Sequence, residues 1–191
     1  MTIKKKTAQL FDYHRLDELG VPVRNLVTDS RQIKPGDTFL AYAGDITDGR
    51  KFIPQAIAAG ANAVLWDPQN FTWNHEWRIP ALAIDELKAK AGLIASYVYD
   101  QPSEKLWMVG ITGTNGKTSC SHWYAQAMTS LGKKTAILGT LGNGFCGELE
   151  AAGNTTPDAA VLQRSLARFV EQGAHGVAME VSSHGLVQGR V

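Results

Sequence analysis

The segment Gly110–Ser119, GITGTNGKTS, constrains the fold of this 191-residue chain more than any other. It follows an apolar run with β-strand character, KLWMVGIT, and it precedes KTSCSHWYAQAMTSL, which predicts a helix from Lys117 to about Leu131. A strand, a glycine-rich turn and a helix in this order form the context of a phosphate-binding loop. Small residues let backbone N–H groups point inward, and the helix N-terminus adds partial positive charge. The segment therefore predicts an α/β fold with a nucleotide site at Gly113, Thr114, Asn115, Gly116, Lys117, Thr118 and Ser119.

The glycines of this loop do not have the usual register. The common phosphate-loop pattern requires a glycine at position 111, where this chain has Ile111, and the glycines stand at 110, 113 and 116 instead. The chemistry of the loop is nevertheless retained. We expect Lys117 to contact the β- and γ-phosphates of a nucleotide, and the Thr118 hydroxyl to help hold Mg²⁺.

A second metal contact is expected at Glu180. The run HGVAMEVSS predicts a buried strand that places Glu180 at its carboxyl end. Ligands of open α/β sheets bind at the carboxyl ends of the strands. The loop 113–119 and the segment 180–183 are therefore expected to lie at the same edge of one sheet.

Strands alternate with helices along the whole chain, which predicts a mostly parallel sheet. Further strands are expected in RNLVTDSR, GDTFLAYAG, AVLW, PALAIDE and KKTAILGT, and helices in KFIPQAIAAG, ending at Gly60, and in DELKAKAGLIASYVYDQPSEK, ending before Pro102. A helix over TTPDAAVLQRSLARFVEQG has Thr156 as its expected N-cap, Pro157 in its first position and Gly173 at its end. Residues 68–79 are expected to form a loop with exposed aromatic side chains. The helix near 86–99 marks the division between a domain over 1–87 and a second domain over 88–191.

Composition excludes several classes of partner. Nineteen basic residues nearly balance 18 acidic ones, so the chain lacks the basic excess typical of proteins that bind nucleic acid or anionic membranes. No apolar run approaches the roughly 20 residues of a membrane span. Cys120 and Cys146 lie far apart in a chain with no export signal, which favours free thiols in the cytoplasm.

Longer motifs resemble one family. GITGTNGKTS is similar to the ATP loop of the Mur ligase superfamily, in which the shifted glycine register is normal. TDSRQIKPGDTFLAYAGDITDGRKFIPQAIAAGA resembles the N-terminal UDP-binding domain of the members that add the third residue of the cell-wall peptide, and GNTTPD and MEVSSHGLVQGRV resemble their muramoyl-peptide contacts. The resemblance covers the chain from about Asn25. It implies a Rossmann-like UDP-binding domain followed by the first part of a P-loop-type central domain.

The resemblance also implies roles for individual residues. Those that would hold uridine and diphosphate are Thr28, Ser30, Asp45, Ile46 and Thr47. Those that would hold the muramoyl-dipeptide are Asn154, Thr155, Thr156, Ser182, Gln188 and Arg190. Glu180 matches a magnesium ligand, and His184 has a possible catalytic or metal-linked role. From the residues alone, TDSR reads as an ordinary polar turn, and a lone histidine is more often structural.

The activity implied is ATP- and Mg²⁺-dependent addition of meso-diaminopimelate or L-lysine to UDP-N-acetylmuramoyl-L-alanyl-D-glutamate through an acyl-phosphate, by a monomer. Family members continue beyond position 191 through a C-terminal domain. The chain by itself is therefore expected not to catalyse ligation.

Two alternatives remain open. A folylpolyglutamate synthase uses the same chemistry, although its loop usually reads GKGS where this chain has Gly116-Lys117-Thr118-Ser119. A non-catalytic module that binds a nucleotide or a wall precursor belongs to a different functional class. Substrate-dependent release of ADP distinguishes a ligase from such a module.

Overall fold

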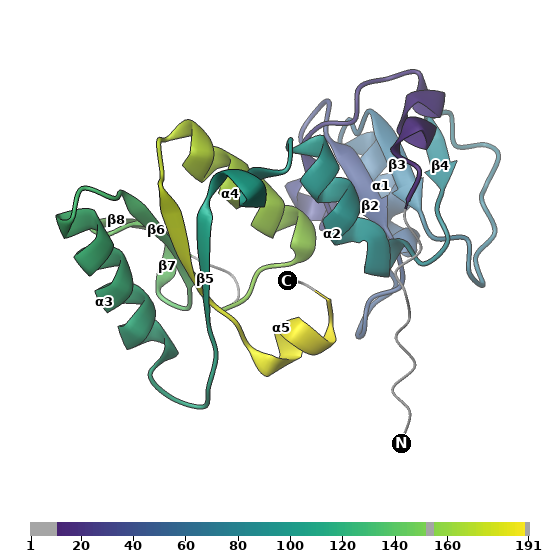
Figure 1. Cartoon of the computed structure of the whole chain (residues 1–191). Coiled ribbons are helices and arrows are strands. Elements are labelled where there is room, and N and C mark those ends of the chain that lie inside the picture. Colours follow the sequence, from purple (N-terminus) through teal and green to yellow (C-terminus); the bar gives the residue numbers. More distant parts are fainter. Residues whose placement is uncertain (1–10, 152–154, 190–191) are drawn as a thin grey trace. The chain divides into compact units, whose positions relative to one another are not determined.

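The computed structural model describes residues 11–151 and 155–189, and the chain divides into two compact units between Ile94 and Ala95 (Figure 1). This division lies inside helix α2 (Leu87–Val98), and the division expected from the sequence lies at the start of the same helix. Each unit contains its own β-sheet with helices, which confirms the α/β class. Within the described ranges, no helix is both long enough and apolar enough to cross a bilayer.

The sheet of the first unit is entirely parallel, with strands in chain order. Its strands are β1 (Leu26–Val27), β2 (Thr38–Ala41), β3 (Ala63–Trp66) and β4 (Ala81–Ala83). The helices of this unit other than α2 are η1 (Tyr13–Leu19), η2 (Ser30–Gln32), η3 (Gly49–Phe52) and α1 (Ile53–Ala58). The strands expected from the sequence are therefore confirmed, and so is the glycine stop at Gly60.

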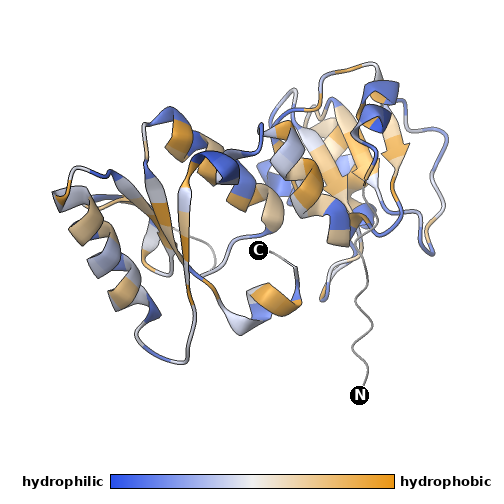
Figure 2. Ribbon diagram, viewed as in Figure 1, coloured by the Kyte–Doolittle hydropathy of each residue, from blue (hydrophilic) through white to orange (hydrophobic). Residues whose placement is uncertain are grey.

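The strands of this sheet are apolar on both faces, as is usual for parallel sheets. Phe39 on β2 packs with Ile53 and Ala56 on α1, while the adjacent Leu40 is equally buried and points to the opposite face. Hydrophobic residues accordingly concentrate along the strands (Figure 2).

The loop 68–79 differs from the expectation. Its aromatic side chains are not exposed: they are half-buried and pack together against the core of the first unit. Ring centroids lie 5.2 Å apart for Trp66 and Trp73, and 4.9 Å apart for Trp73 and Trp77. The prediction of exposed aromatic side chains was wrong. The sequence of this irregular loop has no hydrophobic periodicity that would indicate burial, but folding still removes large aromatic surfaces from water.

The second unit contains a mixed five-stranded sheet with the order β5-β9-β6-β7-β8. The parallel strands are β5 (Trp107–Ile111), β9 (Gly176–Glu180) and β6 (Thr135–Gly139), and the antiparallel ones are β7 (Gly142–Phe145) and β8 (Glu148–Glu150). The helices are η4 (Pro102–Lys105), α3 (Lys117–Ser130), α4 (Ala159–Glu171) and α5 (Ser183–Val187).

The β7–β8 hairpin was not anticipated. Its sequence, GNGFCGELE, has few β-branched residues, and Gly142 and Gly144 have φ angles of +144° and +148°. A Cβ on Gly144 would lie only 2.3 Å from the Glu148 carbonyl oxygen, so the close approach of the two strands requires glycine. The sequence lacked the alternating pattern that predicts a strand.

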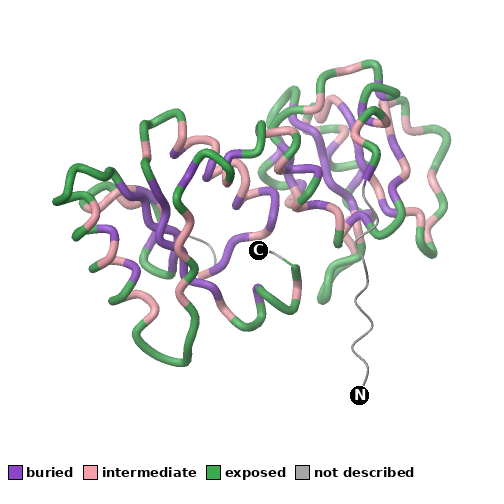
Figure 3. The backbone as a smooth tube through the Cα atoms, viewed as in Figure 1, coloured by how far each residue is buried: buried purple, intermediate pink, exposed green. Residues whose placement is uncertain are grey.

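Helices α3 and α4 cover opposite faces of this sheet. Ile137 on β6 and Ala178 on β9 pack against Ala125 of α3, whereas Val177, one position away, belongs to the cluster that contains Phe169 of α4. Figure 3 shows the central strands β6 and β9 buried between these two layers. The layers hold the carboxyl ends of β5, β6 and β9 in fixed positions.

The start of α4 corrects another expectation. Asp158, rather than Thr156, is the N-cap, since its carboxylate accepts hydrogen bonds of 3.0 Å from the backbone N–H groups of Ala160 and Val161. Pro157 consequently precedes the helix. An aspartate is as good a cap as a threonine, and Thr156 is instead buried within a tertiary hydrogen-bond network. The helix end is as expected, because Gly173 has a left-handed φ of +77° after the last turn.

Candidate functional site

The glycine loop joins β5 to α3 through two residues with left-handed backbone. Gly113 has a φ of +137° and Gly116 a φ of +81°, conformations that favour glycine. Gly116 is the N-cap of α3 and provides no side-chain cap, so the first N–H groups of this 14-residue helix have no side-chain acceptor there. Lys117 folds back over the loop and donates a 2.8 Å hydrogen bond to the Gly113 carbonyl oxygen. This arrangement suits an anion above the loop.

Glu180 ends strand β9 and is 1% exposed. Its Oε2 accepts a hydrogen bond of 3.0 Å from the Thr118 hydroxyl, and its Oε1 accepts one of 2.9 Å from the backbone N–H of Thr140. The Thr140 hydroxyl lies 3.2 Å from Oε2. The loop and the end of β9 thus meet at one sheet edge, as the topology predicted.

The Glu180 carboxylate has no lysine or arginine partner among the residues that the structure describes. Burial of an ionised carboxylate without a cation is costly. The absence of a side chain at Gly139 leaves room for the Glu180 carboxylate, because a Cβ there would lie 2.2 Å from Glu180 Oε1. A buried carboxylate beside a hydroxyl, at the edge of a phosphate-type loop, has the hard oxygen donors that Mg²⁺ prefers.

No group of three or more His, Cys, Asp or Glu residues suited to a metal occurs in the described part of the chain. Mg²⁺ commonly takes only one or two protein ligands and completes its shell with water and substrate phosphates. Thr118 and Glu180 therefore fit this ion, with a nucleotide supplying further oxygens.

Two threonines before α4 lie next to this carboxylate. The buried Thr156 hydroxyl donates to the Glu180 carbonyl oxygen at 3.1 Å and accepts from the Ser182 backbone N–H at 3.1 Å. The Thr155 hydroxyl lies 3.1 Å from the hydroxyl of Thr140. The segment 155–156 is thereby fixed against the ends of β6 and β9.

The remaining residues expected in this unit are distributed over α5. Ser182 is the N-cap of α5 and accepts a 3.0 Å hydrogen bond from the Gly185 N–H. Gln188 is the C-cap, and His184 is exposed. No hydrogen bond or ion pair between His184 and Glu180 occurs among the described residues. Asn154 and Arg190 lie outside the described residues.

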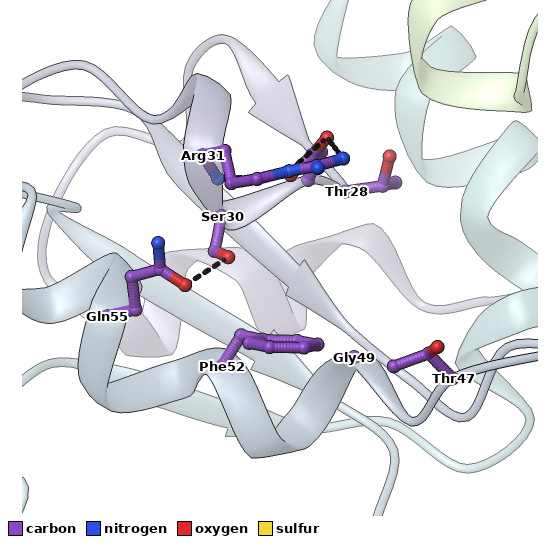
Figure 4. A pocket seen from close by; sticks show the side chains of 8 residues that line it. Thr28, Ser30, Arg31, Thr47, Gly49, Phe52 and Gln55 are labelled. Carbon is purple, nitrogen blue, oxygen red and sulfur yellow. Dashed lines mark hydrogen bonds and ion pairs between the residues drawn. The ribbon is translucent and has the colours of Figure 1, made fainter.

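The first unit contains a cavity of about 440 Å³ at the carboxyl ends of β1 and β2 (Figure 4). Ser30 is 6% exposed, and its hydroxyl donates a 3.0 Å hydrogen bond to Gln55 Oε1. The ring of Phe52, 40% exposed, forms an apolar side of the cavity. The cavity is lined by Thr28, Asp29, Ser30, Arg31, Thr47, Gly49, Phe52 and Gln55.

Only one of the three consecutive residues expected to hold uridine diphosphate, 45–47, lines the cavity. Thr47 lines the cavity, and its carbonyl oxygen accepts a 3.0 Å hydrogen bond from the Gly44 N–H, which closes a tight turn. The Asp45 carboxylate pairs with the ammonium group of Lys88. Ile46 is 99% exposed.

Two aspartate–arginine pairs stabilise the backbone around the cavity. Asp48 caps η3, and a hydrogen bond from the Arg50 guanidinium holds the pKa of the Asp48 carboxyl below its ordinary value. Arg50 is 5% exposed and also donates to the Asp67 carbonyl oxygen at 3.0 Å. Asp29 caps η2, and the hydrogen bond from Arg31 likewise lowers its pKa. These pairs fix the loops that carry Ser30 and Thr47.

Sequence reasoning missed several residues in both sites. Thr140 directly follows the strand in KKTAILGT, so the carboxyl-end rule could have identified it. Phe52 and Gln55 gave no such signal, because they lie on helices whose position over the cavity depends on the tertiary fold.

Two family descriptions match the chain. Residues 22–97 match "Mur ligase family, catalytic domain", and residues 111–191 match "Mur ligase middle domain". Together these ranges include the cavity of the first unit and the Glu180 site of the second.

Curated relatives agree with this match. UDP-N-acetylmuramoyl-L-alanyl-D-glutamate–2,6-diaminopimelate ligase of Nitrosomonas europaea is 58% identical over 92% of the chain and 34% of the relative. The enzyme of the same name from Chromobacterium violaceum is 54% identical over 92% of the chain and 36% of the relative. The chain thus spans about a third of the length of these relatives.

Solved structures give the same result. A UDP-N-acetylmuramoyl-L-alanyl-D-glutamate–2,6-diaminopimelate ligase superimposes with a TM-score of 0.69 at 31% identity, over 89% of this chain and 34% of that one. MurF ligase from Thermotoga maritima in complex with ADP has a TM-score of 0.56 at 20% identity, over 85% of this chain and 32% of that one, a likeness of fold alone.

Proposed function

Because the chain belongs to the Mur ligase family, we propose that it supplies the precursor-binding and nucleotide-binding parts of an ATP-dependent ligase of peptidoglycan synthesis. The reaction is the addition of a diamino acid to UDP-N-acetylmuramoyl-L-alanyl-D-glutamate. The observation that carries this proposal is the buried Glu180 carboxylate, without a described cationic partner, beside Thr118 of the glycine loop. The enzyme acts as a monomer in the cytoplasm.

The added residue is 2,6-diaminopimelate rather than L-lysine. This choice is supported by the names of the relatives, which are diaminopimelate ligases at identities of 44% to 58%. The same names speak against a folylpolyglutamate synthase.

The second unit binds ATP through the loop and α3. The N–H groups of residues 113–119 and the start of α3 hold the phosphates, and Lys117 exchanges its Gly113 carbonyl contact for the β- and γ-phosphates. Thr118 and Glu180 hold Mg²⁺, which when bound neutralises charge on the phosphoryl oxygens. These residues position the γ-phosphate and contribute no covalent step.

The first unit binds the uridine diphosphate part of the precursor. Thr28, Ser30 and Thr47 offer hydroxyls and backbone groups in a cavity of suitable size for part of a nucleotide. The terminal carboxylate of the dipeptide lies near Thr155, Thr156 and Ser182, with Asn154, Gln188 and Arg190 as further contacts. His184 is a candidate for a catalytic or metal-linked role. The carboxylate takes the γ-phosphoryl group of ATP, with cleavage of the β–γ P–O bond and release of ADP. An amine of the diamino acid then attacks the acyl carbon, and inorganic phosphate and a proton leave as the amide forms.

Calorimetric titration of the chain with UDP-N-acetylmuramoyl-L-alanyl-D-glutamate tests this function, with UMP and folate as controls and circular dichroism as a check of folding. We expect the muramoyl-dipeptide to bind more tightly than UMP, because it engages contacts in addition to the uridine cavity. A separate titration with ATP and Mg²⁺ should give saturable binding.

Each outcome has a definite meaning. Equal affinities for the muramoyl-dipeptide and UMP would refute the dipeptide contacts. Folate binding without precursor binding would favour a folylpolyglutamate synthase. When these residues are part of a full-length Mur ligase, ADP release that depends on the precursor identifies a ligase. Binding of the precursor without turnover identifies a non-catalytic module.

A further inference from the structure

We propose that Thr140 is a positioning residue, which holds the Glu180 carboxylate in place for the metal and links it through a directed chain of hydroxyls to Thr155. The inference rests on the proposed function, because it assigns the metal to Glu180. It concerns a residue that lies outside the glycine loop and directly after β6.

Thr140 contacts both oxygens of the carboxylate. Its backbone N–H donates to Glu180 Oε1 at 2.9 Å, and its hydroxyl lies 3.2 Å from Oε2. Since β6 and β9 are adjacent parallel strands, residue 140 lies beside the end of β9. The backbone contact fixes one oxygen whatever the side chain, whereas the second contact requires a hydroxyl at position 140.

The direction of the hydroxyl hydrogen bonds follows from their proton count. An ionised carboxylate only accepts, so the single proton of the Thr140 hydroxyl is donated to Glu180 Oε2. The Thr155 hydroxyl, 3.1 Å from that of Thr140, must then be the donor to Thr140. The order is therefore Thr155 to Thr140 to Glu180, and the lone pairs of Thr155 remain available as acceptors for a ligand.

This order has an energetic consequence. A donor to the Thr140 oxygen polarises its O–H group and strengthens the hydrogen bond that Thr140 makes to the carboxylate. A change at Thr155 therefore alters the hydrogen bonding of the Glu180 carboxylate. The described contacts connect the Thr155 hydroxyl to this carboxylate through Thr140. Thr155 belongs to the segment that we assign to the precursor. The hydrogen bonds from Thr155 to Thr140 and from Thr140 to Glu180 therefore connect the precursor site with the metal site.

The test is the Mg²⁺ dependence of ATP binding by the chain, measured calorimetrically in the wild type and in Thr140→Val, Thr140→Ser and Thr155→Val. Valine keeps the shape of threonine and removes the hydroxyl. We expect Thr140→Val to raise the half-saturating Mg²⁺ concentration by about tenfold, since hydrogen bonds to charged groups are among the stronger ones. Thr140→Ser should stay near the wild type, and Thr155→Val should give a rise of about two- to threefold.

Two controls separate positioning from a general loss of structure. ATP binding in EDTA should be the same in the wild type and Thr140→Val, because the loop amides do not depend on Glu180. Thr135→Val removes a buried hydroxyl from the same strand, where it donates to the Lys133 carbonyl oxygen at 2.8 Å, and should leave the Mg²⁺ dependence unchanged.

The outcomes distinguish the inference from the proposed function. Wild-type Mg²⁺ dependence in Thr140→Val, or an equal defect in Thr140→Ser, overturns the role of the Thr140 hydroxyl. An unchanged Thr155→Val overturns the link to Thr155. A folded wild-type chain without Mg²⁺-dependent ATP binding overturns the proposed function together with this inference.

Discussion

The hydroxyl of Thr118 donates a 3.0 Å hydrogen bond to Oε2 of Glu180, across a separation of 62 residues in the sequence. Thr118 lies in the first turn of helix α3, and Glu180 ends strand β9. The contact exists because β5 and β9 are parallel neighbours, with Ile111 in register with Glu180. It brings a hydroxyl of the phosphate-type loop to a buried carboxylate, and the predictions for the second unit depend on this pair.

Glu180→Gln should abolish most of the Mg²⁺-dependent binding of ATP without destabilising the chain. The amide keeps the shape of the carboxylate, and the hydroxyls of Thr118 and Thr140 can reverse to accept from it. Removing a buried charge that lacks a described cationic partner should leave the free energy of unfolding unchanged or raise it by about 1 kcal/mol. Calorimetry and thermal unfolding measure the two effects, and Glu171→Gln, which removes an exposed charge, is the control. A marked loss of stability would show that Glu180 is mainly structural.

Gly139→Ala should destabilise the second unit by about 1–3 kcal/mol, the usual cost of overpacking. The added Cβ would meet Glu180 Oε1 at 2.2 Å inside a buried strand. Denaturant unfolding measures the cost. In the Glu180→Ala background the same substitution should cost much less, because the opposing carboxylate is gone. Equal costs in both backgrounds would contradict the close approach of Gly139 to Glu180.

Phe52→Ala should weaken the binding of UMP by about tenfold, on the scale of a base stacked on an aromatic ring. The Phe52 ring is 40% exposed and lines the cavity that we assign to uridine diphosphate. Fluorescence or calorimetric titration gives the affinity, and Phe52→Tyr, which retains the ring, should bind like the wild type. If Phe52→Ala binds UMP with wild-type affinity, the base lies elsewhere.

Asp48→Asn should reduce the dependence of stability on acidic pH. The hydrogen bond from Arg50 lowers the pKa of Asp48 in the folded chain below its unfolded value of about 3.9, so the folded state favours the ionised form. The resulting stabilisation is present above the unfolded pKa and is lost as the pH falls through the folded pKa. The difference in unfolding free energy between wild type and variant should therefore be largest near pH 6 and shrink toward pH 2.

Denaturant unfolding over this pH range measures the effect. Asp85→Asn removes an exposed carboxylate and controls for the change in net charge. A difference between wild type and Asp48→Asn that stays constant from pH 6 to pH 2 would refute the lowered pKa of Asp48.

The sequence by itself determined the local elements whose signals are short-range. The strand at Ala63–Trp66, the helix from Lys117 and the end of α4 at Gly173 follow from apolar runs and from residues that start or stop helices. The chemistry of the loop was also legible, because Gly116, Lys117 and Thr118 are consecutive. Positive-φ glycines and helix starts are properties of a few neighbouring residues.

The tertiary structure decided what depends on distant residues. It placed the Thr156 hydroxyl against the Glu180 carbonyl oxygen, a contact that exists only after β9 and the segment before α4 have packed, whereas the Asp158 cap of α4 is a local contact. It packed the half-buried Trp73 and Trp77 against each other in a loop without periodicity. It also set Thr140 beside Glu180, because strand order, which local propensity does not encode, determines which strand ends are neighbours.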